Sequence, residues 1–271
     1  LAQQINQLLD FPEERLKIRR AAYDYSRPMV MKEMGRRYLA LFSQAEVQHA
    51  RARDLPALDT LSQKEQRLPR INLNRLCGMT DDTGMLQHAK FTVPNRAHGY
   101  CVDDNARALI VVTRAGDLNR NDRSLIELSS VYLSFLDDAF DMEKGRFRNF
   151  MSYERKWLET IGSEDSHGRA LWALGVVAGW GQNSGQVALA TKIFNDALPA
   201  LEHFSDSRAI AFPILGMQAY LRRHEGDQRV RELMKSLGDR LLARFRQFAS
   251  KDWLWHEAEL NYDNARLPEA L

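Results

Sequence analysis

Residues 164–180 read EDSHGRALWALGVVAGW and decide the fold class. Two acidic residues open the stretch, Arg169 follows, and residues 170–180 are apolar almost without interruption. A helix that is apolar nearly all round is buried on every side. Gly175 and Gly179 have no side chains and make this segment narrow at two positions. This stretch therefore predicts a polar loop at 164–169 that leads into a buried inner helix at 170–180.

The same order of residues occurs at three other places in the chain. An acid precedes an arginine at Asp103, Asp104 and Arg107, at Asp206 and Arg208, and at Asp263 and Arg266. The arginines are 62, 39 and 58 residues apart, which gives a mean of 53. Recurrence at such a period is typical of repeat architectures, so the chain contains a loose internal repeat.

Amphipathic segments separate these repeat members. Residues 122–140 and 229–248 carry one apolar stripe and one polar face each, which predicts peripheral helices. Each repeat is then a helical hairpin, and the whole is an all-α toroid of hairpins. Only residues 145–153 alternate like a strand, and we expect a small β-hairpin inserted between helices.

The rest of the chain divides into two parts. Residues 1–44 have helical periodicity, with one helix opening at Pro12 and Glu13 after Asp10. Residues 45–70 are polar and contain two prolines, which is typical of a solvated linker. The domains expected are therefore 1–44, a linker at 45–70, and 71–271.

Composition excludes several classes of partner. Lys and Arg total 38 against 36 Asp and Glu, and a net charge of +2 offers no strong attraction for nucleic acid. Residues 170–180 are too short for a membrane span, which needs about 20 residues, and no secretory leader opens the sequence. Cys77 and Cys101 cannot build a disulfide framework, so a cytoplasmic location is expected. The first and last residues also suggest a fragment, truncated within a helical hairpin.

The acids at the helix starts have two possible roles. Asp and Ser are common N-caps that contribute about 1 kcal/mol each, and this is the simpler explanation for any single one. In a toroid, however, the starts of the inner helices meet at one end. Glycosidic-bond chemistry needs two carboxylates roughly 5 to 10 Å apart, one as acid and one as base or nucleophile. The recurrence therefore favours a carbohydrate site.

We expect Asp103 or Asp104 to work with one acid from Glu164, Asp165 and Glu257 as the catalytic pair. Arg107 and Arg169 would orient these acids. The residues expected to hold the sugar are His98, Tyr100, Asn105, His167, Trp255, Asp263 and Asn264, several of them in the long polar loop 80–105.

Other chemistries have less support. The chain has no HExxH, CxxC or GxGxxG motif, so we expect no metal and no cofactor. A metal site from His88, His98 and Asp104 is a minor alternative, as is epimerase-like proton transfer by His98, His167 or His256. The main rival is a non-catalytic domain that binds or presents glycans.

Two resemblances to known families add to this interpretation. Residues 1–44, including Leu8-Leu9-Asp10 and residues 38–42, resemble the closing helices of a group 1 (family 4) GT-B glycosyltransferase. None of that family's catalytic motifs is present here. Residues 79–88 and 98–109 resemble the six-hairpin, (α/α)6 domain fused behind such bacterial enzymes, and residues 164–174 are similar to the inner-helix starts of that wider superfamily of glycosidases and sugar epimerases. The resemblance implies an incomplete (α/α)6 domain that acts on or binds an oligosaccharide and is linked to a glycosyltransferase domain in the same polypeptide.

Overall fold

A computed structural model describes residues 8–27, 33, 35–36, 38–41, 71–118 and 122–271. The described chain is mostly helical with a few two-residue strands, as the sequence predicts for its fold class. It divides into two compact units, residues 1–70 with 250–262, and residues 71–249 with 263–271. Among the helices of the described residues, none combines the length and apolar character that crossing a bilayer requires.

The first unit is built around helix α2 (Pro12–Ser26). Its N-cap is Phe11, and Pro12 takes the first helical position, which is where the sequence predicts the helix to open. The Tyr23 ring lies 4.7 Å from the Trp253 ring, and the Tyr23 hydroxyl donates to the Leu254 carbonyl. Residues 250–262 thus pack with the N-terminal part of the chain, whereas the sequence placed them within the domain 71–271. The expected linker at 45–70 lies outside the described residues.

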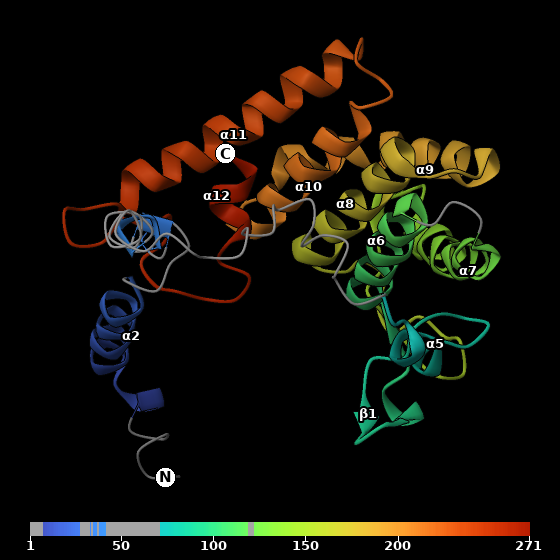
Figure 1. The fold of residues 1–271 in the computed structure, drawn as a ribbon, viewed down its shortest axis with the longest axis horizontal. Helices are drawn as coiled ribbons and strands as arrows, with labels where there is room; N and C mark the ends of the chain where they lie inside the picture. Colours follow the sequence, from blue (N-terminus) through green and yellow to red (C-terminus); the bar gives the residue numbers. More distant parts are fainter. Residues whose placement is uncertain (1–7, 28–32, 34, 37, 42–70, 119–121) are drawn as a thin grey trace, which may run out of the picture. The chain divides into compact units, whose positions relative to one another are not determined.

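Three buried helices form the centre of the second unit. They are α6 (Val102–Leu118), α8 (Glu164–Trp180) and α10 (Ser207–Tyr220), and α8 packs against the other two (Figure 1). Nearly every residue of α8 and α10 is buried, because both helices are apolar around most of their circumference.

Three further helices cover this centre. Helix α7 (Arg123–Ala139) packs on α6, α9 (Ser184–Ala197) on α8, and α11 (Gln228–Phe248) on α10. The predicted peripheral helices at 122–140 and 229–248 are confirmed to within a residue. Helix α11 buries only Val230, Leu237 and Leu241, in keeping with its single apolar stripe. A short 3₁₀ helix, η3 (Leu198–His203), follows α9, and α12 (Arg266–Ala270) packs on α10.

The backbones of α8 and α10 touch, and glycine makes this possible. A Cβ atom on Gly175 would overlap the backbone carbonyl of Gly216, and one on Gly179 would overlap that of Ala219. The contacting residues are about 41 positions apart along the length of both helices, so the helices are parallel and in register. Their N-terminal ends therefore lie at the same end of the unit.

Small strands and short helices connect these elements. In chain order they are α5 (Asn74–Met79), β1 (Ala89–Lys90), β2 (Val93–Pro94), η2 (Arg96–His98), β3 (Tyr100–Cys101), β4 (Phe140–Asp141), β5 (Arg146–Phe147) and β6 (Phe150–Met151). Residues 145–153, predicted to form a small hairpin between helices, hold two strands that do not pair with each other. Strand β5 pairs with β4, and β6 pairs with β3, which is distant in the sequence.

Several of the repeated acids begin helices directly. The sequence placed residues 103–107 and 164–169 in loops, but they form the first turns of α6 and α8. Asp206 is the N-cap of α10 and accepts hydrogen bonds from the backbone N–H groups of Arg208 and Ala209. A cap of this kind stabilises a helix by about 1 kcal/mol, so at Asp206 the simpler explanation holds.

Candidate functional site

One buried arginine collects three carboxylates at the N-terminal end of the central helices. Arg169 is 4% exposed. Its Nε donates to Asp165 Oδ2 at 2.9 Å and its Nη1 donates to Asp263 Oδ2 at 3.1 Å. Asp103 Oδ1 lies 3.9 Å from the same Nε. We call Asp103, Asp165, Arg169 and Asp263 the Arg169 cluster.

The fold places these four residues together from three separate segments. Asp103 lies in the first turn of α6, Asp165 and Arg169 lie in the first turns of α8, and Asp263 lies just before α12. Helix N-termini carry a partial positive charge, which favours carboxylates there. Asp263 adopts a φ of +49°, a left-handed conformation that is uncommon outside glycine and is often found at functional sites.

Asp103 is the most perturbed acid of the Arg169 cluster. Burial, followed by the nearby charge of Asp165, raises its pKa to about 6, against the lowering effects of Arg169 and Arg107. Its Oδ1 atom is buried and accepts no hydrogen bond among the described residues. A buried carboxylate oxygen that accepts no hydrogen bond does little to stabilise the charged form, which agrees with the raised pKa. At neutral pH, Asp103 retains a protonated fraction that an ordinary aspartate lacks.

The raised pKa of Asp103 predicts a pH dependence of stability. The folded state binds this proton more tightly than the unfolded state, so stability attributed to it is present below about pH 4 and declines as the pH rises to about 6. Relative to Asp103→Asn, the wild type should lose about 1 to 2 kcal/mol over this range, allowing for the 26% exposure of the side chain. Urea unfolding of both proteins between pH 4 and 7.5 measures the difference, and a constant difference would contradict the prediction.

A column of stacked groups lies beside the Arg169 cluster, and the sequence did not reveal it. The Trp172 and Phe212 rings are parallel within 5°, with centroids 5.8 Å apart. The Arg169 guanidinium lies 4.2 Å from the Phe212 centroid, and that of Arg266 lies 4.6 Å from the Trp172 centroid. The sequence did hold one signal for these contacts. Trp172 follows Arg169 by three residues and Phe212 follows Arg208 by four, a spacing that places side chains on the same face of a helix.

A second buried arginine completes this end of the unit. Arg208 is 1% exposed, and its Nη2 donates to Asn264 Oδ1 at 2.8 Å. The expected substrate residues Asp263 and Asn264 are thus each bonded to an inner-helix arginine. Asn264 lies at the same end as the Arg169 cluster, as the sequence suggests.

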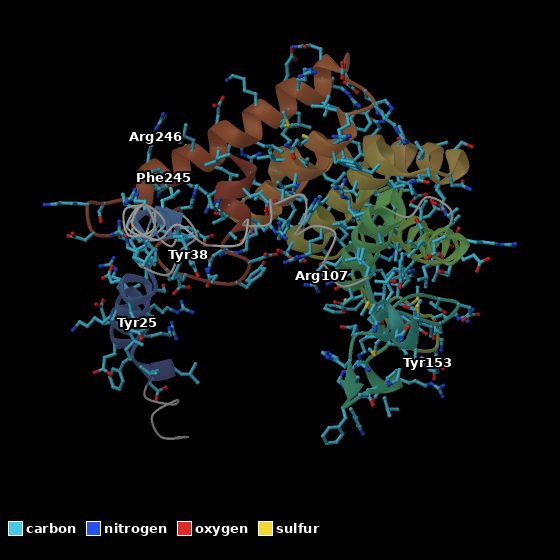
Figure 2. The ribbon with its side chains drawn as sticks, in the orientation of Figure 1. Tyr25, Tyr38, Arg107, Tyr153, Phe245 and Arg246 are labelled. Atoms are coloured by element: carbon cyan, nitrogen blue, oxygen red, sulfur yellow. The ribbon has the colours of Figure 1, made fainter. Side chains whose placement is uncertain are left out.

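The other expected acids of the second unit have different partners. Asp104 accepts hydrogen bonds from Arg107 at 2.7 Å and from Cys101 Sγ at 3.1 Å. Arg107, which is labelled in Figure 2, belongs to the first turns of α6. The Glu164 carboxylate accepts from the backbone N–H groups of Ser205 and Asp206, at 2.7 and 2.9 Å. Glu164 therefore ties the start of α8 to the segment before α10.

Three expected sugar-binding residues are engaged within the protein. Tyr100 is 1% exposed and donates to Asp81 at 2.7 Å. Asn105 is buried, accepts from the Met85 backbone N–H and donates to the Cys101 carbonyl. His167 is buried and lies 3.0 Å from the Ala197 carbonyl through Nε2, and burial lowers its pKa to about 3.

The remaining expected residues lie elsewhere. The exposed His98 ring packs edge-to-face on His88, with centroids 4.6 Å apart. Trp255 and Glu257 belong to the first unit, where the Glu257 carbonyl accepts from Trp253 Nε1. The buried His256 belongs to the same unit.

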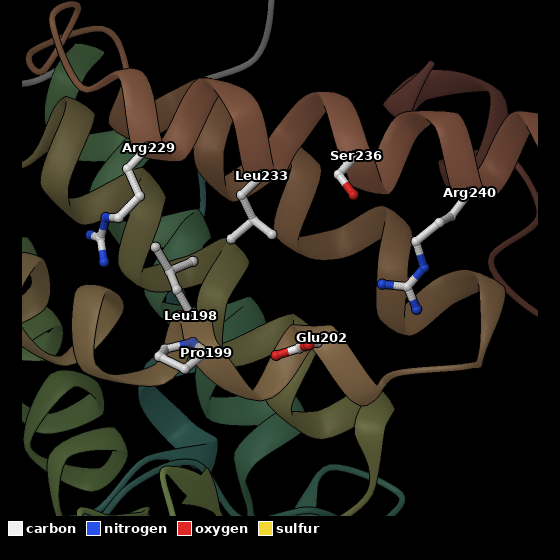
Figure 3. A pocket seen from close by; sticks show the side chains of 7 residues that line it. All are labelled: Leu198, Pro199, Glu202, Arg229, Leu233, Ser236 and Arg240. Carbon is white, nitrogen blue, oxygen red and sulfur yellow. The ribbon is translucent and has the colours of Figure 1, made fainter.

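No group of three or more His, Cys, Asp or Glu side chains in the described part of the chain is arranged to hold a metal ion. In the Arg169 cluster, the guanidinium occupies the position between the carboxylates that a cation would need. A cavity of about 540 Å³ lies between η3 and α11 (Figure 3). Its lining includes Leu198, Leu233 and Arg240, and none of the residues expected for the site.

Fold and site together define a class of protein: a predominantly helical chain with a carboxylate and arginine cluster at the aligned starts of packed inner helices. No protein-family model matches the chain, and no curated protein or solved structure matches it significantly. The resemblances to group 1 glycosyltransferases and to (α/α)6 domains therefore stay predictions.

Proposed function

We propose that the Arg169 cluster is a carbohydrate-processing site in which Asp103 is the general acid and Asp165 is the base or nucleophile. The observation that carries this proposal is the convergence of the two acids on one arginine nitrogen. Asp103 Oδ1 and Asp165 Oδ2 lie 3.9 and 2.9 Å from Arg169 Nε, so the two oxygens are at most about 7 Å apart, close enough to act on the same bond.

The unequal environments of the two acids support a division of roles. Asp103, with its pKa raised to about 6, can donate a proton near neutral pH to the leaving glycosidic oxygen. Asp165 accepts a hydrogen bond from Arg169 and supplies the second carboxylate. It would either take a proton from an attacking water or bond to the anomeric carbon, after which water would release the sugar. Arg169 would position both acids.

Access to the cluster is consistent with a neutral, polyhydroxylated ligand. The side chains of Asp103, Asp165 and Asp263 are 26%, 20% and 30% exposed. Each therefore keeps surface available to a ligand while its carboxylate is held by Arg169. Sugar hydroxyls both donate and accept hydrogen bonds, so alternating carboxylates and guanidinium groups complement them.

The proposal also includes the arrangement of the helices as part of a ring of hairpins. The packing of α8 against α6 and α10, each of the three covered by one outer helix, supports an incomplete (α/α)6 ring linked to glycosyltransferase helices in residues 1–44. The free thiols of Cys77 and Cys101 support a cytoplasmic setting.

The test is turnover of an oligosaccharide panel by the full chain, with products detected by mass spectrometry. Asp103→Asn should lower the rate by about 10²- to 10⁴-fold, because the neutral amide cannot donate a proton to the leaving group. Asp196→Asn, on the exposed face of α9, is the matched control and should keep the wild-type rate. Turnover by Asp103→Asn at the wild-type rate would remove Asp103 from the chemistry.

A non-catalytic glycan-binding domain is the second candidate. It is favoured by the fact that one arginine lies within 4.0 Å of all three carboxylates, as in a structural ion network. This function predicts oligosaccharide binding without turnover, and Asp103→Asn would then change the binding affinity by no more than about twofold.

A further inference from the structure

Two arginines and a tryptophan stack at the opposite end of the central helices. The guanidinium carbons of Arg114 and Arg222 each lie 3.5 Å from the centroid of the Trp180 ring. Two groups at that distance cannot share one face of a ring without overlapping, so they cover opposite faces. The guanidinium groups are thus held about 7 Å apart, with Trp180 between them.

The three residues come from the C-terminal ends of different helices. Arg114 lies in the last turn and a half of α6, Trp180 is the last residue of α8, and Arg222 follows α10. Asp165 and Trp180 are 15 positions apart on α8, which corresponds to about 22 Å along a helix. The stack is therefore separate from the Arg169 cluster.

Both guanidinium groups have unused donors. Arg114 and Arg222 are exposed residues, and neither side chain has a hydrogen-bond or ion-pair partner within the described ranges. Most other arginines around the central helices do have hydrogen-bond or ion-pair partners. Arg169 binds carboxylates and Arg208 binds an amide, while Arg240 binds backbone carbonyls.

Capping of the nearby helix ends does not account for the stack. The Gly181 carbonyl, at the end of α8, accepts from Arg223 Nη2 at 2.5 Å. The Gly116 carbonyl of α6 accepts from Gln182 Nε2 at 2.8 Å. Helix C-termini carry about half a negative charge each, which two full positive charges outweigh locally. The stacked arginines leave a net positive, donor-rich surface.

We propose that the stack of Arg114, Trp180 and Arg222 binds a diphosphate group. Arginine binds phosphate best with two parallel N–H donors in the guanidinium plane. The two planes are too far apart for one phosphate to align with both, whereas the two phosphoryl groups of a diphosphate can each meet one plane. Trp180 keeps the planes parallel and so sets the spacing. This inference does not depend on the proposed function.

Calorimetric titration of the full chain with inorganic pyrophosphate and with orthophosphate tests the proposal. At low salt, the wild type should bind pyrophosphate at least about tenfold more tightly than orthophosphate. The double variant Arg114→Gln/Arg222→Gln should weaken pyrophosphate binding by more than about tenfold. Trp180→Leu keeps both charges but removes the spacer, and it should lower the preference for pyrophosphate to about threefold or less.

The matched control removes two positive charges elsewhere. Arg123→Gln/Lys235→Gln lies on the exposed faces of α7 and α11 and should keep wild-type affinity. Thermal unfolding of every variant checks that the fold is intact. Failure of the wild type to bind pyrophosphate, equal losses in the two double variants, or an unchanged preference in Trp180→Leu would each overturn the proposal.

Discussion

Replacing Arg169 by methionine is expected to lower the free energy of unfolding by about 3 to 5 kcal/mol at pH 7. The reason is charge, since Asp103, Asp165 and Asp263 would face one another without the guanidinium that now separates them. Methionine keeps most of the aliphatic volume, so the change isolates the loss of the ionic group. The side chain is 5% exposed, and solvent cannot replace those contacts.

The loss in Arg169→Met should depend on pH. Arg169 lowers the pKa of Asp103, so its removal raises that pKa further and lets the carboxyl group stay protonated at mildly acidic pH. The destabilisation should therefore be larger at pH 8 than at pH 5 when both are measured by urea unfolding. Arg107→Met is the control, because its pair with Asp104 is half exposed and is worth about 0 to 1 kcal/mol. Equal losses in the two variants would contradict a central role for Arg169.

Gly175→Ala is expected to destabilise the protein by about 2 to 3 kcal/mol, although alanine is the better helix former. The added methyl group would overlap the backbone carbonyl of Gly216, and a backbone carbonyl in a buried helix cannot turn aside. Helices α8 and α10 would have to separate along their shared length. That movement would also change the contacts between Arg169 and the residues at the start of α10.

Gly238→Ala, by contrast, is expected to stabilise the protein. Gly238 lies in α11, and no atom lies within 4 Å of the position that its Cβ would take. Alanine there should raise the free energy of unfolding by about 0.5 to 1 kcal/mol. Urea unfolding at pH 7 measures both variants. A stabilising effect at Gly175 would show that α8 and α10 are not in backbone contact.

Periodicity predicted the helices well. The peripheral helices at 122–140 and 229–248 appear as α7 and α11 because an apolar stripe with a polar face has one stable position at a surface. The pairing of residues 145–153 was not predictable, because strands of two residues carry little pattern of their own. Strand β6 pairs with β3, some fifty residues earlier, through contacts that only the packed helices bring together.

The candidate site was predictable in part. The repeated acid and arginine pattern drew attention to Asp103, Asp165, Arg169 and Asp263, which the structure brings together. It also singled out Asp104 and Glu164, which bind a neighbouring arginine and a backbone segment. Acids that are adjacent in a helix point in directions about 100° apart, so adjacent acids such as Asp103 and Asp104 do not share one target.

The sequence by itself determined the helical class, the buried inner helix over 170–180, and the positions before the inner helices where acids and arginines collect. It could do so because burial and capping depend on residues that are close along the chain. Tertiary structure alone decided which carboxylates meet Arg169, and that Trp180 separates Arg114 from Arg222. Those contacts join residues up to about a hundred positions apart, and their geometry follows from how closely the glycine faces of α8 and α10 allow the helices to pack.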